Sequence, residues 1–162
     1  MDTVSIVLVG IGGQGTVTAS DILANAAFRA GRDVKKAEVH GMSQRGGSVR
    51  TDVRFGSTVL SPITPAASAD VVLSMDASQD AAAGPLLRPG GTLLTPAVLE
   101  GVSLPSPKTA AVAMLGALSR RLDLPEETWT DAIAAILPAK LLAMNLEAFA
   151  LGRDAGRPCD PE

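Results

Sequence analysis

The sequence is poor in aromatic residues. Its 162 residues include no tyrosine, one tryptophan and three phenylalanines. Because 46% of the residues are hydrophobic, a buried core can still form, but alanine, valine, leucine and isoleucine must build it. That composition is typical of a layered α/β domain. It argues against a nucleic-acid module, which would stack bases on exposed aromatic side chains.

Cysteine is scarce as well. The single cysteine, Cys159, excludes a disulfide within the chain and cannot build an iron–sulfur cluster or a cysteine-based zinc site. No His/Asp/Glu cluster has the spacing of metal ligands. We see no secretion signal at the N-terminus and no apolar stretch long enough to cross a bilayer, so we expect a cytoplasmic protein without membrane contact.

The familiar catalytic motifs are missing too. No Gly-Lys-Ser/Thr follows the first glycines, which excludes a P-loop. There is no Gly-Asp-Gly with a downstream Asn-Asn, the motif that binds thiamine diphosphate. No Ser–His–Asp or Cys–His set can be argued from the sequence. We therefore expect no catalytic residues and no metal ligands in this chain.

A glycine-rich turn follows the first predicted strand, residues 4–9, and precedes a predicted helix. Its residues are Gly10, Gly12, Gly13, Gln14 and Gly15. Glycines permit a tight turn, and the N-terminus of the helix attracts anions. Glu38 lies roughly where a dinucleotide-binding fingerprint places its acid. From the pattern alone, an NAD or FAD site and a purely packing role for the glycines are equally good interpretations.

A second glycine-rich segment spans residues 40–48. It contains His40, Gly41, Ser43, Gln44, Arg45, Gly46 and Gly47. Such a segment can present backbone N–H groups, a guanidinium and two hydroxyls to a phosphate or a carboxylate. A plain connection between two strands is the other interpretation, but the density of donors favours a functional loop.

The remaining pattern predicts one α/β domain over residues 1–151 and a loose tail over residues 152–162. We expect three layers, a largely parallel sheet, an antiparallel portion at residues 48–60 and a helical C-terminal part. Seven of the 14 lysines and arginines lie between residues 29 and 54, although the net charge is -3. That segment can meet phosphates or an acidic partner, but a solvated sheet edge explains the charge better.

The two glycine-rich segments and the Val-Arg strand after them resemble the gamma-type domain of 2-oxoacid:ferredoxin oxidoreductases. The His-Gly-Met-Ser-Gln-Arg-Gly-Gly form, residues 40–47, looks most like the beta subunit of indolepyruvate:ferredoxin oxidoreductase. The resemblance runs from about Val4 to the last predicted helix and includes the stretch 114–118. Both segments in this order and spacing make it fairly specific.

The resemblance implies an accessory subunit of an oxidoreductase that acts on an oxo group with an iron–sulfur protein as acceptor. The large partner subunit then carries thiamine diphosphate and iron–sulfur clusters and converts a 2-oxoacid and coenzyme A to acyl-CoA and CO2 while ferredoxin is reduced. The resemblance further implies that this chain binds neither thiamine diphosphate nor an iron–sulfur cluster, and that it is inactive alone. The resemblance also favours packing or anion binding over NAD at residues 10–15, and it directs residues 40–48 toward the partner or the coenzyme A phosphates.

Two other functions remain open from the residues. One is an autonomous oxidoreductase that binds NAD or FAD through residues 10–15 and Glu38. The other is a binding module for an anionic metabolite at residues 40–48.

Overall fold

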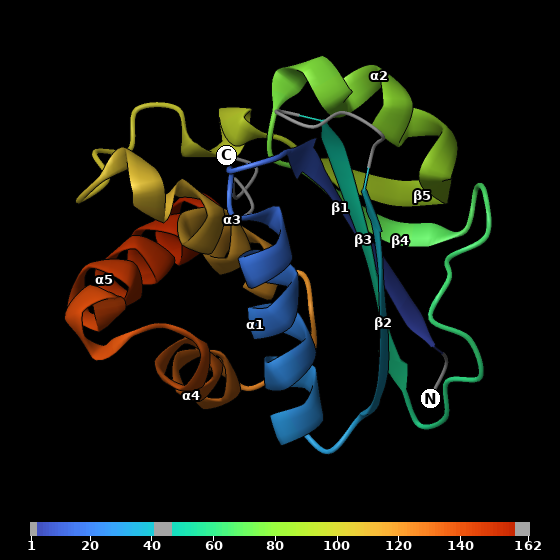
Figure 1. Cartoon of the computed structure of the whole chain (residues 1–162), viewed down its shortest axis with the longest axis horizontal. Coiled ribbons are helices and arrows are strands. Elements are labelled where there is room, and N and C mark those ends of the chain that lie inside the picture. The colour runs from blue at the N-terminus through green and yellow to red at the C-terminus, as the bar shows by residue number, and fades with distance from the viewer. Residues whose placement is uncertain (1–2, 41–46, 158–162) are drawn as a thin grey trace, which may run out of the picture.

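A computed structural model describes residues 3–40 and 47–157 of the chain. They form one five-stranded sheet with the order β2-β3-β1-β4-β5 (Figure 1). The strands are β1 (Val4–Ile11), β2 (Asp33–His40), β3 (Ser48–Gly56), β4 (Ala69–Ser74) and β5 (Leu87–Leu94). The α-helices are α1 (Thr16–Arg29), α2 (Asp80–Ala83), α3 (Ala110–Ser119), α4 (Glu126–Ile136) and α5 (Ala139–Ala155).

Strand direction confirms a largely parallel sheet with an antiparallel portion. β1 is parallel to β4, and β4 is parallel to β5. β3 is antiparallel to both of its neighbours, β1 and β2, so it alone runs the opposite way. The antiparallel portion predicted at residues 48–60 ends earlier, because β3 ends at Gly56 and residues 58–60 form no strand. There the Asp33 carboxylate accepts the Val59 N–H at 2.7 Å, which holds the segment as a loop.

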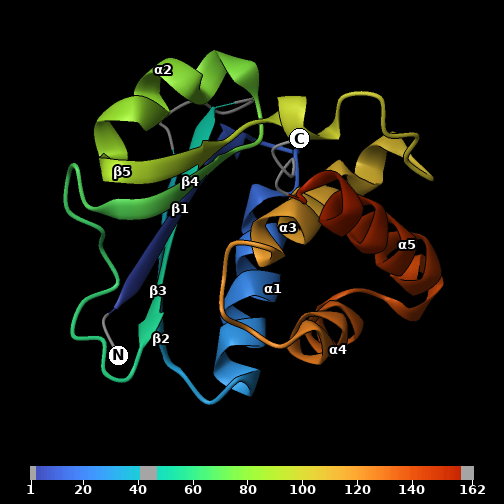
Figure 2. The same cartoon turned by 180° about the vertical axis from the view of Figure 1, so that it is seen from behind.

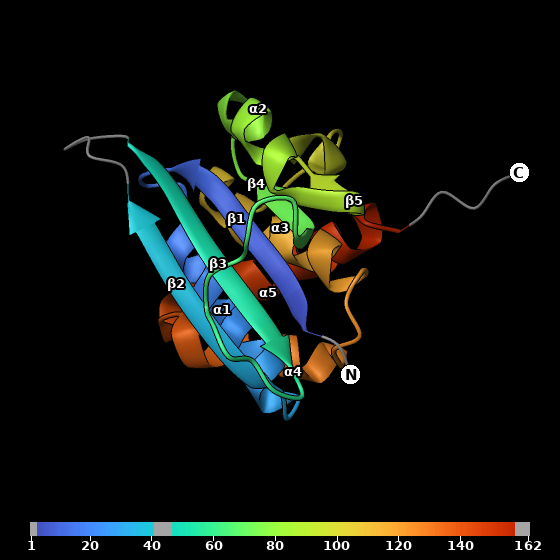
Figure 3. The same cartoon turned by 90° about the vertical axis from the view of Figure 1, so that its right-hand side faces the viewer.

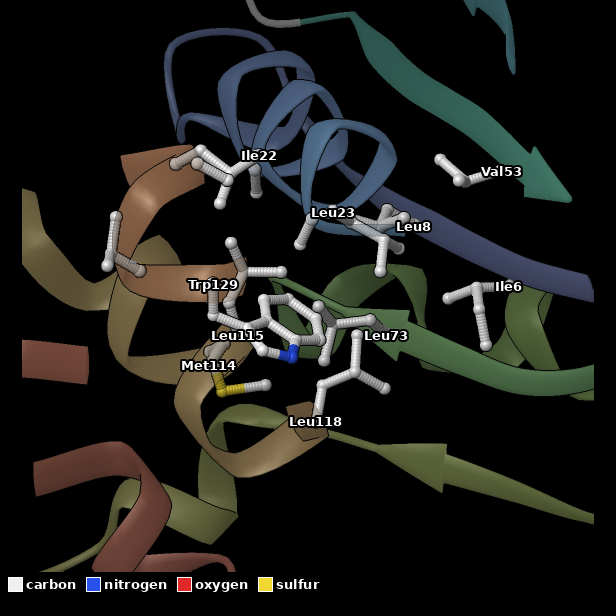
Figure 4. Close-up of a cluster of buried hydrophobic side chains, with 14 of the residues drawn as sticks. Ile6, Leu8, Ile22, Leu23, Val53, Leu73, Met114, Leu115, Leu118 and Trp129 are labelled. Carbon is white, nitrogen blue, oxygen red and sulfur yellow. The ribbon is translucent and has the colours of Figure 1, made fainter. Parts of the chain in front are cut away.

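Most helices cover one face of the sheet. α1, α3, α4 and α5 lie on that side (Figures 1 and 2). Side chains of the sheet such as Ile6, Leu8 and Leu73 meet those of α1, α3 and α4 in one buried cluster (Figure 4). The fully buried Trp129 of α4 contacts Phe149 of α5, with 5.9 Å between ring centroids. Two of the four aromatic residues thus lie where α4 and α5 meet.

The opposite face has a thinner cover. Over β4 and β5 lie α2 and two short 3-10 helices, Ala77–Gln79 and Gly84–Leu86. Their apolar contact is a small cluster that contains Val7, Val72 and Ala83. Residues 57–68 cross the rest of this face (Figure 3). The three layers are therefore present but unequal.

The C-terminal helix extends past the predicted start of the tail. α5 ends at Ala155, and Gly152 is buried in it against α3. Arg153 donates to Ser119 Oγ at 2.8 Å and pairs with Glu126 at 2.9 Å. The prediction of a loose tail is therefore wrong for residues 152–155, because contacts with α3 and α4 hold them. Cys159 lies outside the described residues.

Gly152 gives the first testable prediction. A Cβ at this position would overlap the backbone carbonyl of Ala113 in α3, so the two helices would have to separate. We expect Gly152→Ala to lower the free energy of unfolding by about 3 kcal/mol, which is a fall of roughly 6–12 °C in Tm. Thermal denaturation followed by circular dichroism measures this.

Gly84→Ala is the matched control. Gly84 also has a negative φ, and a Cβ there would meet nothing within 4 Å. Its Tm should stay close to that of the parent chain. Equal stability of the Gly152→Ala variant would show that the α3–α5 contact is not tightly packed.

Candidate functional site

The connections of the sheet place a crevice between β1 and β4. From β1 the chain runs through α1 to β2 on one side, whereas β4 leads to β5 on the other. Ligands of open α/β sheets bind at such a switch point, beyond the carboxyl ends of the strands. The glycine-rich turn of residues 10–15 lies at the end of β1, and Met75 and Asp76 follow the end of β4. The first predicted motif therefore occupies the expected position.

Geometry requires glycine at several positions of this turn. Gly13 and Gly15 have φ values of 88° and 81°, in the left-handed region that other residues avoid. A Cβ on Gly10 would overlap Thr16 Oγ1 and lie 3.1 Å from Met75 Cβ. A Cβ on Gly15 would lie 3.2 Å from Ala111 of α3. The glycines thus allow β1, α1 and α3 to approach one another closely.

Gln14 links this turn to the end of β4 through hydrogen bonds. Its Oε1 accepts the Ile11 N–H at 2.8 Å, and its Nε2 donates to Asp76 Oδ2 at 2.7 Å. Hydrogen bonds from Ser78, followed by the one from Gln14, lower the pKa of Asp76, so its carboxylate remains an acceptor. The sequence interpretation missed Asp76. Its place immediately after a predicted buried strand was the available signal.

Two hollows flank the turn. The larger, about 560 Å³, has an apolar wall that includes Met75, Leu99 and Met114, and Lys108 is the charged residue in its lining. The smaller, about 220 Å³, lies at the first turn of α1 beside Val49.

The first turn of α1 is suited to an anion. It contains no acidic residue, and no side chain hydrogen-bonds to it as an N-terminal cap. No acidic residue of this first turn therefore offsets the positive end of the helix dipole.

The structure joins the two glycine-rich segments at their described ends. The Gly12 N–H donates to the Gly47 carbonyl at 3.0 Å, so the second segment returns directly to the first turn. His40 is the last residue of β2 and is exposed. Five predicted site residues lie outside the described part of the chain: Gly41, Ser43, Gln44, Arg45 and Gly46.

Glu38 does not lie beside the glycine turn. It is opposite Thr51 in β3, and Thr51 is opposite Leu8 in β1, so a whole strand separates Glu38 from β1. Two strand spacings amount to roughly 10 Å. Glu38 instead hydrogen-bonds to Lys36 and lies 3.3 Å from His40 Nε2, and these two partners lower its pKa. The fingerprint suggested by the sequence is therefore not assembled.

This arrangement predicts that NAD and FAD do not bind in the micromolar range. The acid that would hold the ribose is too far from the turn that would hold the pyrophosphate. Isothermal titration calorimetry should detect no saturable heat with either dinucleotide, and Glu38→Ala should change nothing. Micromolar binding that disappears in Glu38→Ala would contradict the assignment.

Two further observations bear on the site. In the described ranges, no group of three or more His, Cys, Asp or Glu side chains could hold a metal ion. None of the helices described there is both long and apolar enough to cross a membrane.

Comparison with known proteins gives close sequence relatives. The family described as pyruvate ferredoxin/flavodoxin oxidoreductase matches residues 5–107. Indolepyruvate oxidoreductase subunit IorB of Thermococcus kodakarensis is 32% identical, over 97% of this chain and 98% of that protein. The pyruvate/ketoisovalerate oxidoreductases common subunit gamma of the same organism is 34% identical, over 72% of this chain and 67% of that protein.

Solved structures share the fold. The chain superimposes with a TM-score of 0.74 on a pyruvate oxidoreductase subunit from Thermotoga maritima, at 24% identity, over 95% of this chain and 97% of that one. With the 2-oxoglutarate:ferredoxin oxidoreductase of Magnetococcus marinus the TM-score is 0.83 at 21% identity, over 96% of this chain but 31% of that one. Since the family matches well over half of the chain and IorB is similar along nearly all of it, the chain belongs to the pyruvate ferredoxin/flavodoxin oxidoreductase family.

Proposed function

We propose that this chain is the accessory subunit of a 2-oxoacid:ferredoxin oxidoreductase of the indolepyruvate type. The observation that carries the proposal is the similarity to IorB along nearly the whole chain, at 32% identity. In the complex, a 2-oxoacid and coenzyme A give acyl-CoA and CO2, and ferredoxin takes up the electrons. We propose an aryl pyruvate as the 2-oxoacid, because the similar proteins are named for indolepyruvate.

The proposal assigns thiamine diphosphate and the iron–sulfur clusters to the large partner subunit. A cluster needs several cysteine ligands, whereas this chain has one cysteine. The sequence also lacks a thiamine-binding motif. The single cysteine leaves no disulfide within the chain, in keeping with the cytoplasm as the compartment of the complex.

We further propose that the two glycine-rich segments face the partner subunit or the phosphates of coenzyme A. The contact between Gly12 and Gly47 brings the segments to one end of the sheet. The uncapped first turn of α1 and Lys108 lie at the same end and add positive potential. Arg45, in the second segment, would contribute a guanidinium with paired donors for a phosphate or a carboxylate.

The proposal predicts that the isolated chain is inactive. We expect no reduction of a viologen acceptor by the pure chain with aryl pyruvates and coenzyme A, and turnover once the large subunit of the same organism is added. Spectrophotometry of the acceptor measures both. Turnover by the pure chain alone, or a complete enzyme that never needs this chain, would refute the proposal.

Arg45 tests the role of the second segment. Loss of an anchoring arginine weakens binding by about 2 kcal/mol or more, whereas loss of a solvated one changes stability within about half a kcal/mol. We expect Arg45→Ala to leave the Tm of the free chain nearly unchanged. Complex formation, or the apparent affinity for coenzyme A, should weaken at least tenfold, about 1.4 kcal/mol. Arg45→Lys should rescue this only partly, because an ammonium lacks the planar paired donors.

Arg29→Ala is the control for Arg45. Arg29 is exposed in the last turn of α1 and donates to Asn25 of the same helix. Its replacement should affect neither assembly nor coenzyme A. Arg153 is unsuitable as a control, because it bonds to Ser119 and Glu126. If Arg45→Ala unfolds the chain while its folded fraction assembles normally, the segment is structural.

A further inference from the structure

A long connection crosses the less covered face of the sheet. Residues 57–68 join β3 to β4 without a helix or a strand and pass in front of β3 on the side away from α1 (Figure 3). Loops of about this length without secondary structure are uncommon in compact domains and are often functional. We call residues 59–64 of this connection the strap.

Side chains of β2 and β3 hydrogen-bond to both ends of the strap. Asp33 Oδ2 accepts the Val59 N–H at 2.7 Å, and Val59 is buried. At the other end, Asp52 Oδ2 accepts the Thr64 N–H at 2.7 Å, and the Arg50 guanidinium donates to the Thr64 carbonyl at 3.1 Å. Asp52 is only 2% exposed, and Arg50 holds it through two hydrogen bonds of 2.7 and 2.8 Å. The Arg50–Asp52 ion pair therefore lies beside this end of the strap, and both of its members hydrogen-bond to the Thr64 backbone.

Arg54 of β3 fastens the middle of the strap. Its guanidinium donates to the carbonyls of Ser61 at 2.9 Å and Ile63 at 3.3 Å, and to Ser5 Oγ at 3.0 Å. All three acceptors are neutral. Within the part of the chain that the structure describes, no carboxylate lies within ion-pair distance of Arg54. Its positive charge therefore remains next to the strap.

These hydrogen bonds hold apolar side chains in solvent. Leu60 is 93% exposed and Ile63 is 49% exposed. Val39 of β2, 54% exposed, pairs with Arg50 of β3, and paired residues share a face of the sheet, so Val39 lies on this face too. A leucine held almost wholly in water gains nothing for the isolated fold. A loop fixed in advance loses little conformational entropy on binding, so this is the arrangement expected of an interface.

We propose that the strap is a docking element for the catalytic subunit, with Leu60 and Ile63 inserted into an apolar groove of that subunit. The inference rests on the proposed function and extends it by naming the face that docks. An acidic residue at the rim of the groove would face Arg54, since the charge of Arg54 lies beside the apolar side chains.

Charge and domain organisation both favour this partner. A second copy of the chain would bring another Arg54 toward the same apolar contact, and like charges disfavour that pairing. In the Magnetococcus marinus oxidoreductase, the matching region is only 31% of a longer chain. The same fold therefore occurs there as one part of a longer oxidoreductase polypeptide. The other parts of such a polypeptide can bury a sheet face that the fold itself leaves incompletely covered.

Leu60→Asp tests the proposal. Because the side chain is almost wholly exposed, the Tm of the free chain should stay within 2 °C of the parent, a change of about 1 kcal/mol or less. The dissociation constant for the purified catalytic subunit, measured by biolayer interferometry, should rise at least tenfold. Ile63→Asp should raise it in the same direction. Phe28→Asp is the matched control, because Phe28 is 70% exposed on α1, in the layer on the opposite face, and its dissociation constant should be unchanged.

The outcomes separate the two proposals. If the parent chain does not bind the catalytic subunit at all, the proposed function fails. If the parent binds and both Leu60→Asp and Ile63→Asp bind equally well, the function stands and the docking face is wrong. If sedimentation shows a dimer of the free chain that Leu60→Asp converts to a monomer, the occupant is a second copy, which also overturns the docking proposal.

Discussion

The hydrogen bonds of Gln14 are the link on which the site depends. They join the turn after β1 to Asp76 after β4, across the point where the chain connections diverge to opposite sides of the sheet. The crevice exists because the two strand ends are held together while the chain leaves them in opposite directions. The glycines belong to the same construction, since side chains at Gly10 or Gly15 would press on Thr16 or Ala111. Both hollows beside the turn take their walls from this arrangement.

The position of β3 separates this fold from a dinucleotide-binding one. A strand between β1 and β2 carries Glu38 away from the glycine turn and leaves it to Lys36 and His40. The same strand brings Gly47 to Gly12, so the second glycine-rich segment returns to the end of the sheet where the helix dipole and Lys108 lie. One antiparallel strand thus moves Glu38 away from the turn after β1 and brings Gly47 to that turn.

The two faces of the sheet differ in what stabilises them. Toward α1 and the C-terminal helices, the contacts are apolar and include Trp129 and Phe149. On the other face, charged side chains of β2 and β3 make most of the connections to the strap, and Leu60 and Ile63 remain in solvent. Burial of apolar area explains the first face, since it stabilises the isolated chain. On the second face, directional hydrogen bonds fix the shape of the strap while Leu60 and Ile63 stay exposed, which is what the proposed docking requires.

The sequence by itself determined the fold class, most of the elements and the two glycine-rich segments, because a buried strand, an amphipathic helix and a glycine turn each leave a local pattern in neighbouring residues. The antiparallel portion predicted at residues 48–60 likewise contains β3. Tertiary structure alone decided which strands are neighbours, and this is why Glu38 was placed wrongly and Asp76 was missed. It also decided that Gly152 and Arg153 belong to α5, since their glycine- and charge-rich surroundings resemble a tail until α3 and α4 contact them. Such contacts join residues far apart in the chain, and no local pattern records them.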